Sequence, residues 1–287
     1  MLEASLTRGL HSLARRYCIT KIDYWGRKYS RLIDQGRDRE PDGIDHSLEA
    51  KKLFPRYIVL KAILAELERY IPEDFDSFSK AKVKITQVIN EAVSFMTKAN
   101  DDDNVTRNTM SEERSSFVSY LENVSAAKVM SQPPLFYRRK LSVPEIELLW
   151  TQLNDIWAIK TRGPWIPLDG SQNELTLAFM DDYFDSEVGY ELLRKFLKEH
   201  GVNHVYELRE LEFSPEYELE LSAFTPTYAF NGEGFWCSKE MDWVIYASHE
   251  NSITIGGEWL INKVKEVWSN WESRLWLDWE ERLERGI

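Results

Sequence analysis

The first 130 residues carry hydrophobic positions at helical spacing. In the segment 52–71, apolar side chains recur close to every 3.6 residues, at Ile58, Leu60, Ile63, Leu64 and Leu67. The segment 74–96 repeats this pattern, and residues 5–34 resemble a longer helix with an aromatic stripe. The polar segments 34–46 and 98–113 are typical of exposed connections. The pattern therefore predicts a bundle of four or five helices that ends near residue 128.

The hydrophobic period changes to two after about residue 200. Five segments have the alternation or composition of strands: 204–213, 216–224, 227–237, 242–248 and 252–256. The connections between them are too short for crossover helices, so the sheet should be antiparallel. Helical patterns at 144–155, 186–201 and 256–284 supply elements that can cover the sheet.

These patterns predict an α+β fold, with an N-terminal helical bundle followed by an antiparallel sheet packed with helices. We expect a helical domain at 1–130, a linker at 131–143 and an acidic, Trp-rich α+β domain at 144–287. The stretch 131–145, which contains this linker, has three prolines and no periodicity. Tryptophan supports the division, because only Trp25 lies in the first part and the other ten lie at or after Trp150.

Charge is divided as unevenly as tryptophan. Residues 1–140 hold 24 Lys and Arg against 20 Asp and Glu, whereas residues 141–287 hold 12 against 28, which gives +4 and −16. The acidic half should repel nucleic-acid phosphates and attract a basic protein. The sequence has no apolar run long enough for a membrane span and no secretory signal pattern, so we expect a cytoplasmic protein with two reduced cysteines.

Known motifs for cofactors and metals are missing from the sequence. It contains no phosphate-binding loop, dinucleotide fingerprint or zinc-protease helix, and we expect no cofactor. His200 and His204 have the spacing of metal ligands on a helix, but Gly201 would end that helix, so we expect no metal there. The basic run at 136–140 should form salt bridges within the molecule.

His249 and Glu250 are the candidate residues for catalysis. They lie between two predicted strands, and a histidine supported by Glu250 or Glu233 could transfer protons in a small hydrolase or transferase. Adjacent residues of a strand point to opposite faces, however, so the two cannot pair unless the chain turns there. We prefer the interpretation that they are polar groups of a hairpin, with no catalytic residue assigned.

The tryptophans of the second half are the strongest unusual feature. Most should fill the core, but those interspersed with acidic residues near the C-terminus, including Trp276 and Trp279, suggest an exposed aromatic–acidic surface. Aromatic anchors ringed by charges are typical of protein-binding hot spots. We select six residues as a candidate interface: Trp236, Asp242, His249, Glu250, Trp271 and Glu272.

Four segments, "FPRY", "YRRKL", "HVYELRE" and "DWVIYASHENSITIGGEWL", resemble a group of bacterial proteins of unassigned function. That group is similar in style to the immunity proteins of polymorphic-toxin systems. The resemblance implies a cytosolic protein that neutralises a cognate toxin, and it implies no catalytic residues. Together with the acidic half, it predicts a non-enzymatic inhibitor whose partner is a basic protein such as a toxin domain. The sequence does not fix the oligomeric state.

Overall fold

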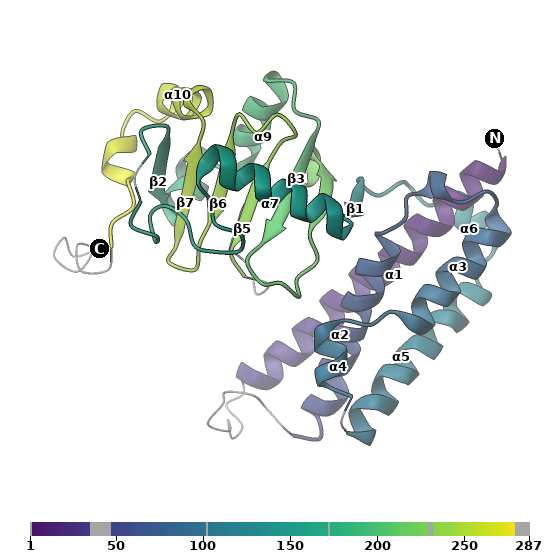
Figure 1. Ribbon diagram of the computed structural model, residues 1–287. Helices are drawn as coiled ribbons and strands as arrows, with labels where there is room; N and C mark the ends of the chain where they lie inside the picture. The colour runs from purple at the N-terminus through teal and green to yellow at the C-terminus, as the bar shows by residue number, and fades with distance from the viewer. Residues whose placement is uncertain (1, 35–46, 102, 172, 229–231, 279–287) are drawn as a thin grey trace. The chain divides into compact units, whose positions relative to one another are not determined.

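The computed structural model describes residues 2–34, 47–101, 103–171, 173–228 and 232–278 (Figure 1). The chain divides into two compact units, Met1–Leu135 and Phe136–Ile287. The first is helical and the second combines helices with an antiparallel sheet, so the α+β prediction is confirmed. Apart from Asp34, the predicted connection at 34–46 lies outside the described residues, as does Trp279.

The helical unit is built around a long first helix. Its elements are α1 (Leu2–Asp34), α2 (Ala50–Leu67), the 3-10 turn η1 (Pro72–Asp74), α3 (Phe78–Glu91), α4 (Phe95–Ala99), α5 (Asn104–Glu122) and α6 (Ala126–Met130). The helix predicted at 5–34 is confirmed as α1, and Ser77 caps α3 by accepting a hydrogen bond from the Lys80 amide. Their apolar faces form one core that includes Leu10, Val59, Ile63, Ile85 and Phe117.

The predicted connection at 98–113 is wrong over most of its length, because α5 begins at Asn104. Asp103 caps this helix, and its carboxylate accepts a hydrogen bond of 2.6 Å from the Val105 amide. The buried positions of its first turns include Thr106 and Met110, with few large apolar residues. A polar sequence therefore forms a helix here because tertiary packing against α2 and α3 overrides its weak pattern.

The helical core also encloses charged groups. Both Nε and Nη2 of Arg15 donate to one carboxylate oxygen of Glu68, at 3.1 and 3.0 Å, and both side chains are buried. His11, one turn earlier on α1, forms a hydrogen bond of 3.2 Å through Nε2 with the Leu67 carbonyl, at the end of α2. These buried polar contacts connect α1 with the C-terminal end of α2.

The second unit contains a seven-stranded sheet whose neighbouring strands are all antiparallel, as predicted. Its strands are β1 (Arg138–Lys140), β2 (Thr176–Met180), β3 (His204–Arg209), β4 (Tyr217–Glu220), β5 (Gly234–Cys237), β6 (Val244–Ala247) and β7 (Ser252–Gly256). Their order across the sheet is β1-β4-β3-β5-β6-β7-β2. The two strands that come first in the chain are thus the two edges.

Both edge strands were absent from the prediction. Arg138–Lys140 pairs with β4, so part of the predicted linker at 131–143 belongs to the sheet. A three-residue basic strand has no hydrophobic alternation by which it could be recognised. The predicted salt bridges are present, since Arg139 lies 2.7 Å from Glu145 and 2.9 Å from Glu218.

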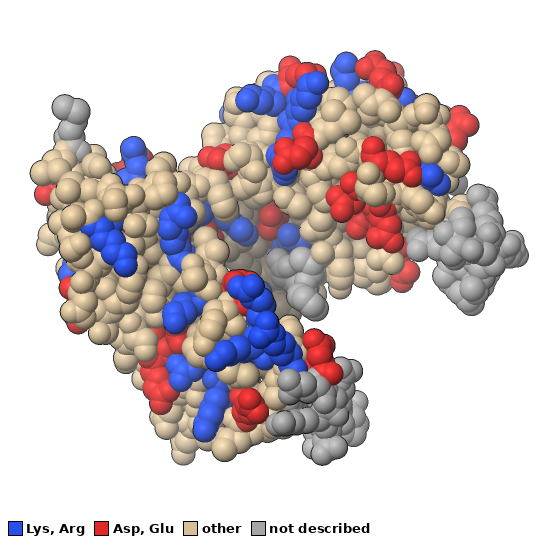
Figure 2. Space-filling model, turned by 180° about the vertical axis from the view of Figure 1, so that it is seen from behind, with Lys and Arg blue, Asp and Glu red and all other residues tan. Residues whose placement is uncertain are grey.

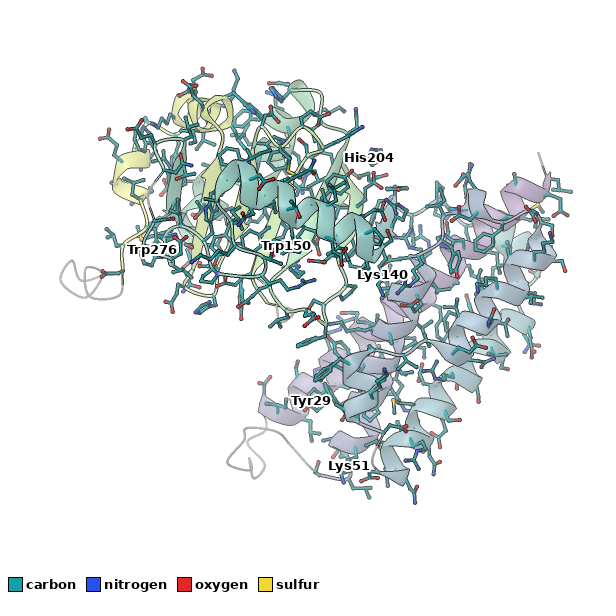
Figure 3. The ribbon with its side chains drawn as sticks, in the orientation of Figure 1. Tyr29, Lys51, Lys140, Trp150, His204 and Trp276 are labelled. Atoms are coloured by element: carbon teal, nitrogen blue, oxygen red, sulfur yellow. The ribbon has the colours of Figure 1, made fainter. Side chains whose placement is uncertain are left out.

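Helices cover both faces of the sheet (Figure 1). Helix α7 (Val143–Trp157) packs on one face, where Trp150 lies over the sheet (Figure 3). Helices α9 (Tyr190–Glu199) and α10 (Glu258–Val267) pack on the other. Because neither face is open to water, β5, β6 and β7 are buried at every position.

The elements next to these helices are irregular. A single turn, α8 (Asp181–Tyr183), leads into the π-helical turn η2 (Phe184–Val188), and α9 begins only at Tyr190 rather than at residue 186 as predicted. The 3-10 turn η3 (Leu221–Ala223) ends the alternation of β4. After α10 the chain forms the 3-10 turn η4 (Trp271–Arg274), so the C-terminal helical prediction holds for 258–267 but not for 268–278, where the described residues end.

Candidate functional site

The turn between β6 and β7 brings together the polar groups of the candidate site. Asn251 adopts a left-handed backbone with φ of 54°, which reverses the chain between the two strands. The reversal places His249 and Glu250 at the tip, at the end of the sheet where β5 begins. Glu233, directly before β5, lies beneath them.

Glu233 is a buried carboxylate that orients the exposed histidine. Its side chain is 1% exposed, and Oε1 lies 2.5 Å from His249 Nδ1. The hydroxyl of Tyr246, from β6, donates to its other oxygen, Oε2. Burial raises the pKa of Tyr246, and the bond to Glu233 raises it further, so this hydroxyl keeps its proton and remains a donor. Both carboxylate oxygens are thereby fixed in position.

His249 and Glu250 do come together, because the chain turns where they lie. Nε2 of His249 is 3.4 Å from Glu250 Oε1, and the two side chains are 55% and 53% exposed. Ser248 and Ser252 are buried, and their hydroxyl oxygens are 2.6 Å apart. Since these hydroxyls bond to each other, neither is presented to His249 as a nucleophile.

Aromatic and acidic groups surround this turn. The indole of Trp276 donates to the Glu250 carbonyl at 3.1 Å, and Figure 3 shows Trp276 near the end of the last described segment. The ring of Tyr228, which is 47% exposed, lies 6.4 Å from that of His249. On the other side, the Asp181 amide donates to the Asn251 carbonyl. We define the acidic–aromatic surface by six residues at this end of the sheet: Asp181, Asp182, Tyr228, His249, Glu250 and Trp276.

The carboxylates beside the turn influence one another. Burial raises the pKa of Asp181, and the negative charges of Asp182 and Asp185 act in the same direction, against a stabilising hydrogen bond from Tyr190. A cation bound near these groups would relieve their repulsion.

The other predicted interface residues do not join this surface. The expectation that Trp236 is exposed is wrong: it is 0% exposed and faces the core under α9 and α10. Gly234 permits this packing, because a Cβ there would lie 2.3 Å from the Trp236 ring. Successive side chains of the short strand β5 point to opposite faces of the sheet. Because helices cover both faces, Trp236 and its neighbours in the strand are all buried.

Asp242 lies at the opposite end of the sheet, in the connection before β6. Its carboxylate is 2.7 Å from His200 Nε2, and the His200 ring stacks on Trp259 at 3.8 Å. His204 packs its ring against Tyr137 instead, so His200 and His204 do not face a common point. Asp242 is exposed but remote from His249 in the sheet topology.

Trp271 and Glu272 lie in η4. Trp271 packs partly against the core beneath α10, and the Lys265 ammonium is 4.2 Å from its ring centre. Glu272 is exposed. Of the six selected residues, the structure therefore brings only His249 and Glu250 into direct contact. Trp276, Tyr228 and Tyr246 were not selected, because sequence spacing does not reveal which aromatic residue meets a distant turn.

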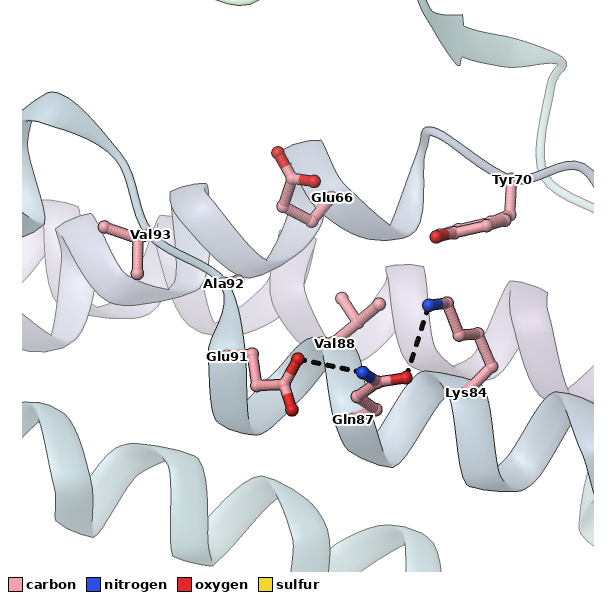
Figure 4. A pocket seen from close by; sticks show the side chains of 8 residues that line it. All are labelled: Glu66, Tyr70, Lys84, Gln87, Val88, Glu91, Ala92 and Val93. Carbon is pink, nitrogen blue, oxygen red and sulfur yellow. Dashed lines mark hydrogen bonds between the residues drawn. The ribbon is translucent and has the colours of Figure 1, made fainter.

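A depression of about 320 Å³ lies between α2 and α3 of the helical unit (Figure 4). Lys84 donates to Gln87 at 3.2 Å, and Gln87 donates to Glu91 at 2.9 Å, along the surface of α3. These polar side chains satisfy one another at helical spacing. We assign this depression no function.

Within the described ranges, no helix is long and apolar enough to cross a membrane. The same residues contain no group of three or more His, Cys, Asp or Glu side chains arranged to hold a metal ion. Comparison of the chain with family models, curated proteins and solved structures finds no match. Its function must therefore be argued from the site alone.

Proposed function

We propose that this chain is a non-enzymatic protein-binding module that inhibits a basic protein, in the manner of an immunity protein or antitoxin that neutralises a basic toxin in the cytoplasm. The observation that carries the proposal is the acidic–aromatic surface. It combines exposed carboxylates with the exposed ring of Tyr228 and the half-buried ring of Trp276, and aromatic rings attract lysine and arginine side chains.

The negative net charge of the second unit, which contains the sheet, supports a basic partner. Residues 136–287 hold 15 Lys and Arg against 28 Asp and Glu, a net charge of −13. On the face seen in Figure 2, Asp and Glu side chains form several groups on this unit. Such a field accelerates association with a positively charged protein, and salt weakens the effect.

Affinity capture with matched variants tests the proposal. The tagged protein, the double variant Asp182→Lys/Glu250→Lys and the control Glu240→Lys would each be used to capture proteins from the source cells at low and moderate salt. Glu240 is exposed and precedes Asp242, at the other end of the sheet. We expect one basic protein to bind the wild type and the control, to be lost from the double variant, and to dissociate as salt rises.

Co-expression then tests inhibition. If the captured protein is toxic to cells, the wild type should protect them and the double variant should not. Capture that is unchanged by both lysine substitutions, or that is insensitive to salt, would contradict the proposal.

A second candidate is a small hydrolase or transferase that uses His249 as a general base. The observation that favours it is the buried Glu233 carboxylate on Nδ1, which is how acid–base histidines are oriented. Substitution His249→Ala should then abolish turnover, whereas His200→Ala, at the exposed His200–Asp242 pair, should not. Full biological effect in His249→Ala would exclude this candidate.

A further inference from the structure

The two outermost groups of the turn form a pair of metal-ligand type. His249 presents an imidazole nitrogen and Glu250 a carboxylate oxygen, 3.4 Å apart. Imidazole and carboxylate together suit divalent transition metals such as Zn²⁺. Neither ligand depends on the partner proposed above, so a metal ion can bind here whether or not the chain inhibits a basic protein.

The hydrogen bonds of Glu233 determine which nitrogen is available. A carboxylate accepts hydrogen bonds, so the proton of a neutral imidazole lies on Nδ1, which is 2.5 Å from Glu233 Oε1. Nε2 then keeps its lone pair and lies 3.4 Å from Glu250 Oε1. A lone pair beside a carboxylate oxygen is an unfavourable contact by itself, and either a proton on Nε2 or a metal ion held by both atoms makes it favourable.

The distance between the two atoms fits a shared zinc ion. Zn–N and Zn–O bonds of about 2.1 Å at a tetrahedral angle place the two ligand atoms roughly 3.4 Å apart. The observed separation of Nε2 and Oε1 is 3.4 Å. The separation of the two atoms is therefore that of two ligands of one tetrahedral ion.

The surroundings of His249 match those of metal-bound histidines. Such histidines donate their second ring N–H to a carboxylate or carbonyl, which fixes the ring and raises its basicity as a ligand. Glu233 supplies that carboxylate from a position that is 1% exposed, and Tyr246 holds its other oxygen. The backbone amide of His249 also lies 3.4 Å from Glu233 Oε1, which restrains the residue further.

We propose that His249 Nε2 and Glu250 Oε1 bind a divalent transition-metal ion, with Glu233 as the positioning carboxylate. The pair supplies two ligands, and the described part of the chain contains no group of three or more His, Cys, Asp or Glu side chains arranged for a metal ion. With two protein ligands, the affinity should be modest compared with that of structural zinc sites that have four.

Titration of the full-length protein with Zn²⁺ alone tests the proposal. In protein labelled with ¹⁵N at histidine, we expect Zn²⁺ to shift the Nε2 resonance of His249 at one equivalent, while the His200 resonances stay in place. His200 is the matched control, because its Nε2 is already bonded to Asp242. Isothermal titration of the same samples gives the affinity.

Three variants separate the roles of the residues. His249→Ala should abolish this binding event, and because the His249 side chain is exposed, its removal leaves the core packing intact. Glu250→Gln should weaken binding strongly, and Glu233→Gln should weaken it by about 10–100-fold, the usual cost of losing such a carboxylate. His200→Ala should leave the affinity unchanged.

Zn²⁺ binding with the same affinity in His249→Ala would overturn the proposal, as would the absence of any Nε2 shift at millimolar Zn²⁺. A Glu250→Gln variant that binds as tightly as the wild type would also overturn it, because the histidine would then act without its partner. None of these outcomes bears on capture of a basic protein.

Discussion

Lowering the pH from 7 to 5 should destabilise the helical unit through His11. This side chain is 3% exposed in the core formed by α1 and α2. Burial lowers its pKa from 6.5 to about 4, and the positive charge of Arg15 contributes to the decrease, while the hydrogen bond to the Leu67 carbonyl opposes it. His11 is therefore neutral in the folded protein over a pH range in which the unfolded chain binds a proton.

The direction and size of the effect follow from linkage. Because the folded pKa is depressed, the stability contributed by neutral His11 is complete above about pH 7, decreases as the pH falls through 6.5, and stops decreasing below about 4. With these two values, the free energy of unfolding should fall by about 2 kcal/mol between pH 7 and pH 5 from this group alone.

Urea denaturation followed by circular dichroism at 222 nm measures this difference. The carboxylates of the protein titrate as well, so the wild type is compared with His11→Gln, in which they remain while the imidazole is removed. The variant should be less stable at pH 7, yet it should lose about 2 kcal/mol less than the wild type on going to pH 5. Equal losses in the two proteins would refute the reasoning.

Three further substitutions probe the packing, each by urea denaturation at pH 7. Trp236→Ala should cost about 3–5 kcal/mol, because a fully buried indole leaves a cavity; a cost below 1 kcal/mol would mean that the ring is exposed. Arg15→Met removes the guanidinium that faces buried Glu68 and should cost about 3–5 kcal/mol, most of which the double variant with Glu68→Leu should recover. Gly257→Ala should cost about 1–3 kcal/mol, since the residue has φ of 116° and its new Cβ would lie 2.8 Å from the Asp242 carbonyl oxygen; an unchanged stability would contradict that geometry.

Much of the fold could be predicted from the sequence, because its longer elements have strong hydrophobic periodicity. Helix α3 and the strands β3 to β7 fall within the predicted segments, whereas α1 and α2 overlap theirs but begin at Leu2 and Ala50, before the predicted starts at residues 5 and 52. Helix α5 was missed because few of its positions are large and apolar. Strand β1 was missed because a three-residue basic segment gains its structure only from its neighbour β4.

The candidate site was predictable only in part. The motif around His249 and Glu250 was evident, but the turn that pairs them depends on the backbone of Asn251. The sequence left either Glu250 or Glu233 as the carboxylate that supports His249, because a contact across 16 residues leaves no periodic signal. The burial of Trp236 could not be inferred, because the sequence does not show that helices cover both faces of β5.

The strand order of the sheet has a consequence for synthesis of the chain. Both edge strands are made before any strand of the centre, and Thr176 of β2 pairs with Gly256, which follows it by 80 residues. As the chain leaves the ribosome, β2 has no partner until β7 has emerged, and β1 has none until β4 has emerged. The β1 edge can therefore form once β4 has emerged, whereas the β2 edge is completed last, and until then β2 exposes unpaired backbone groups to other chains.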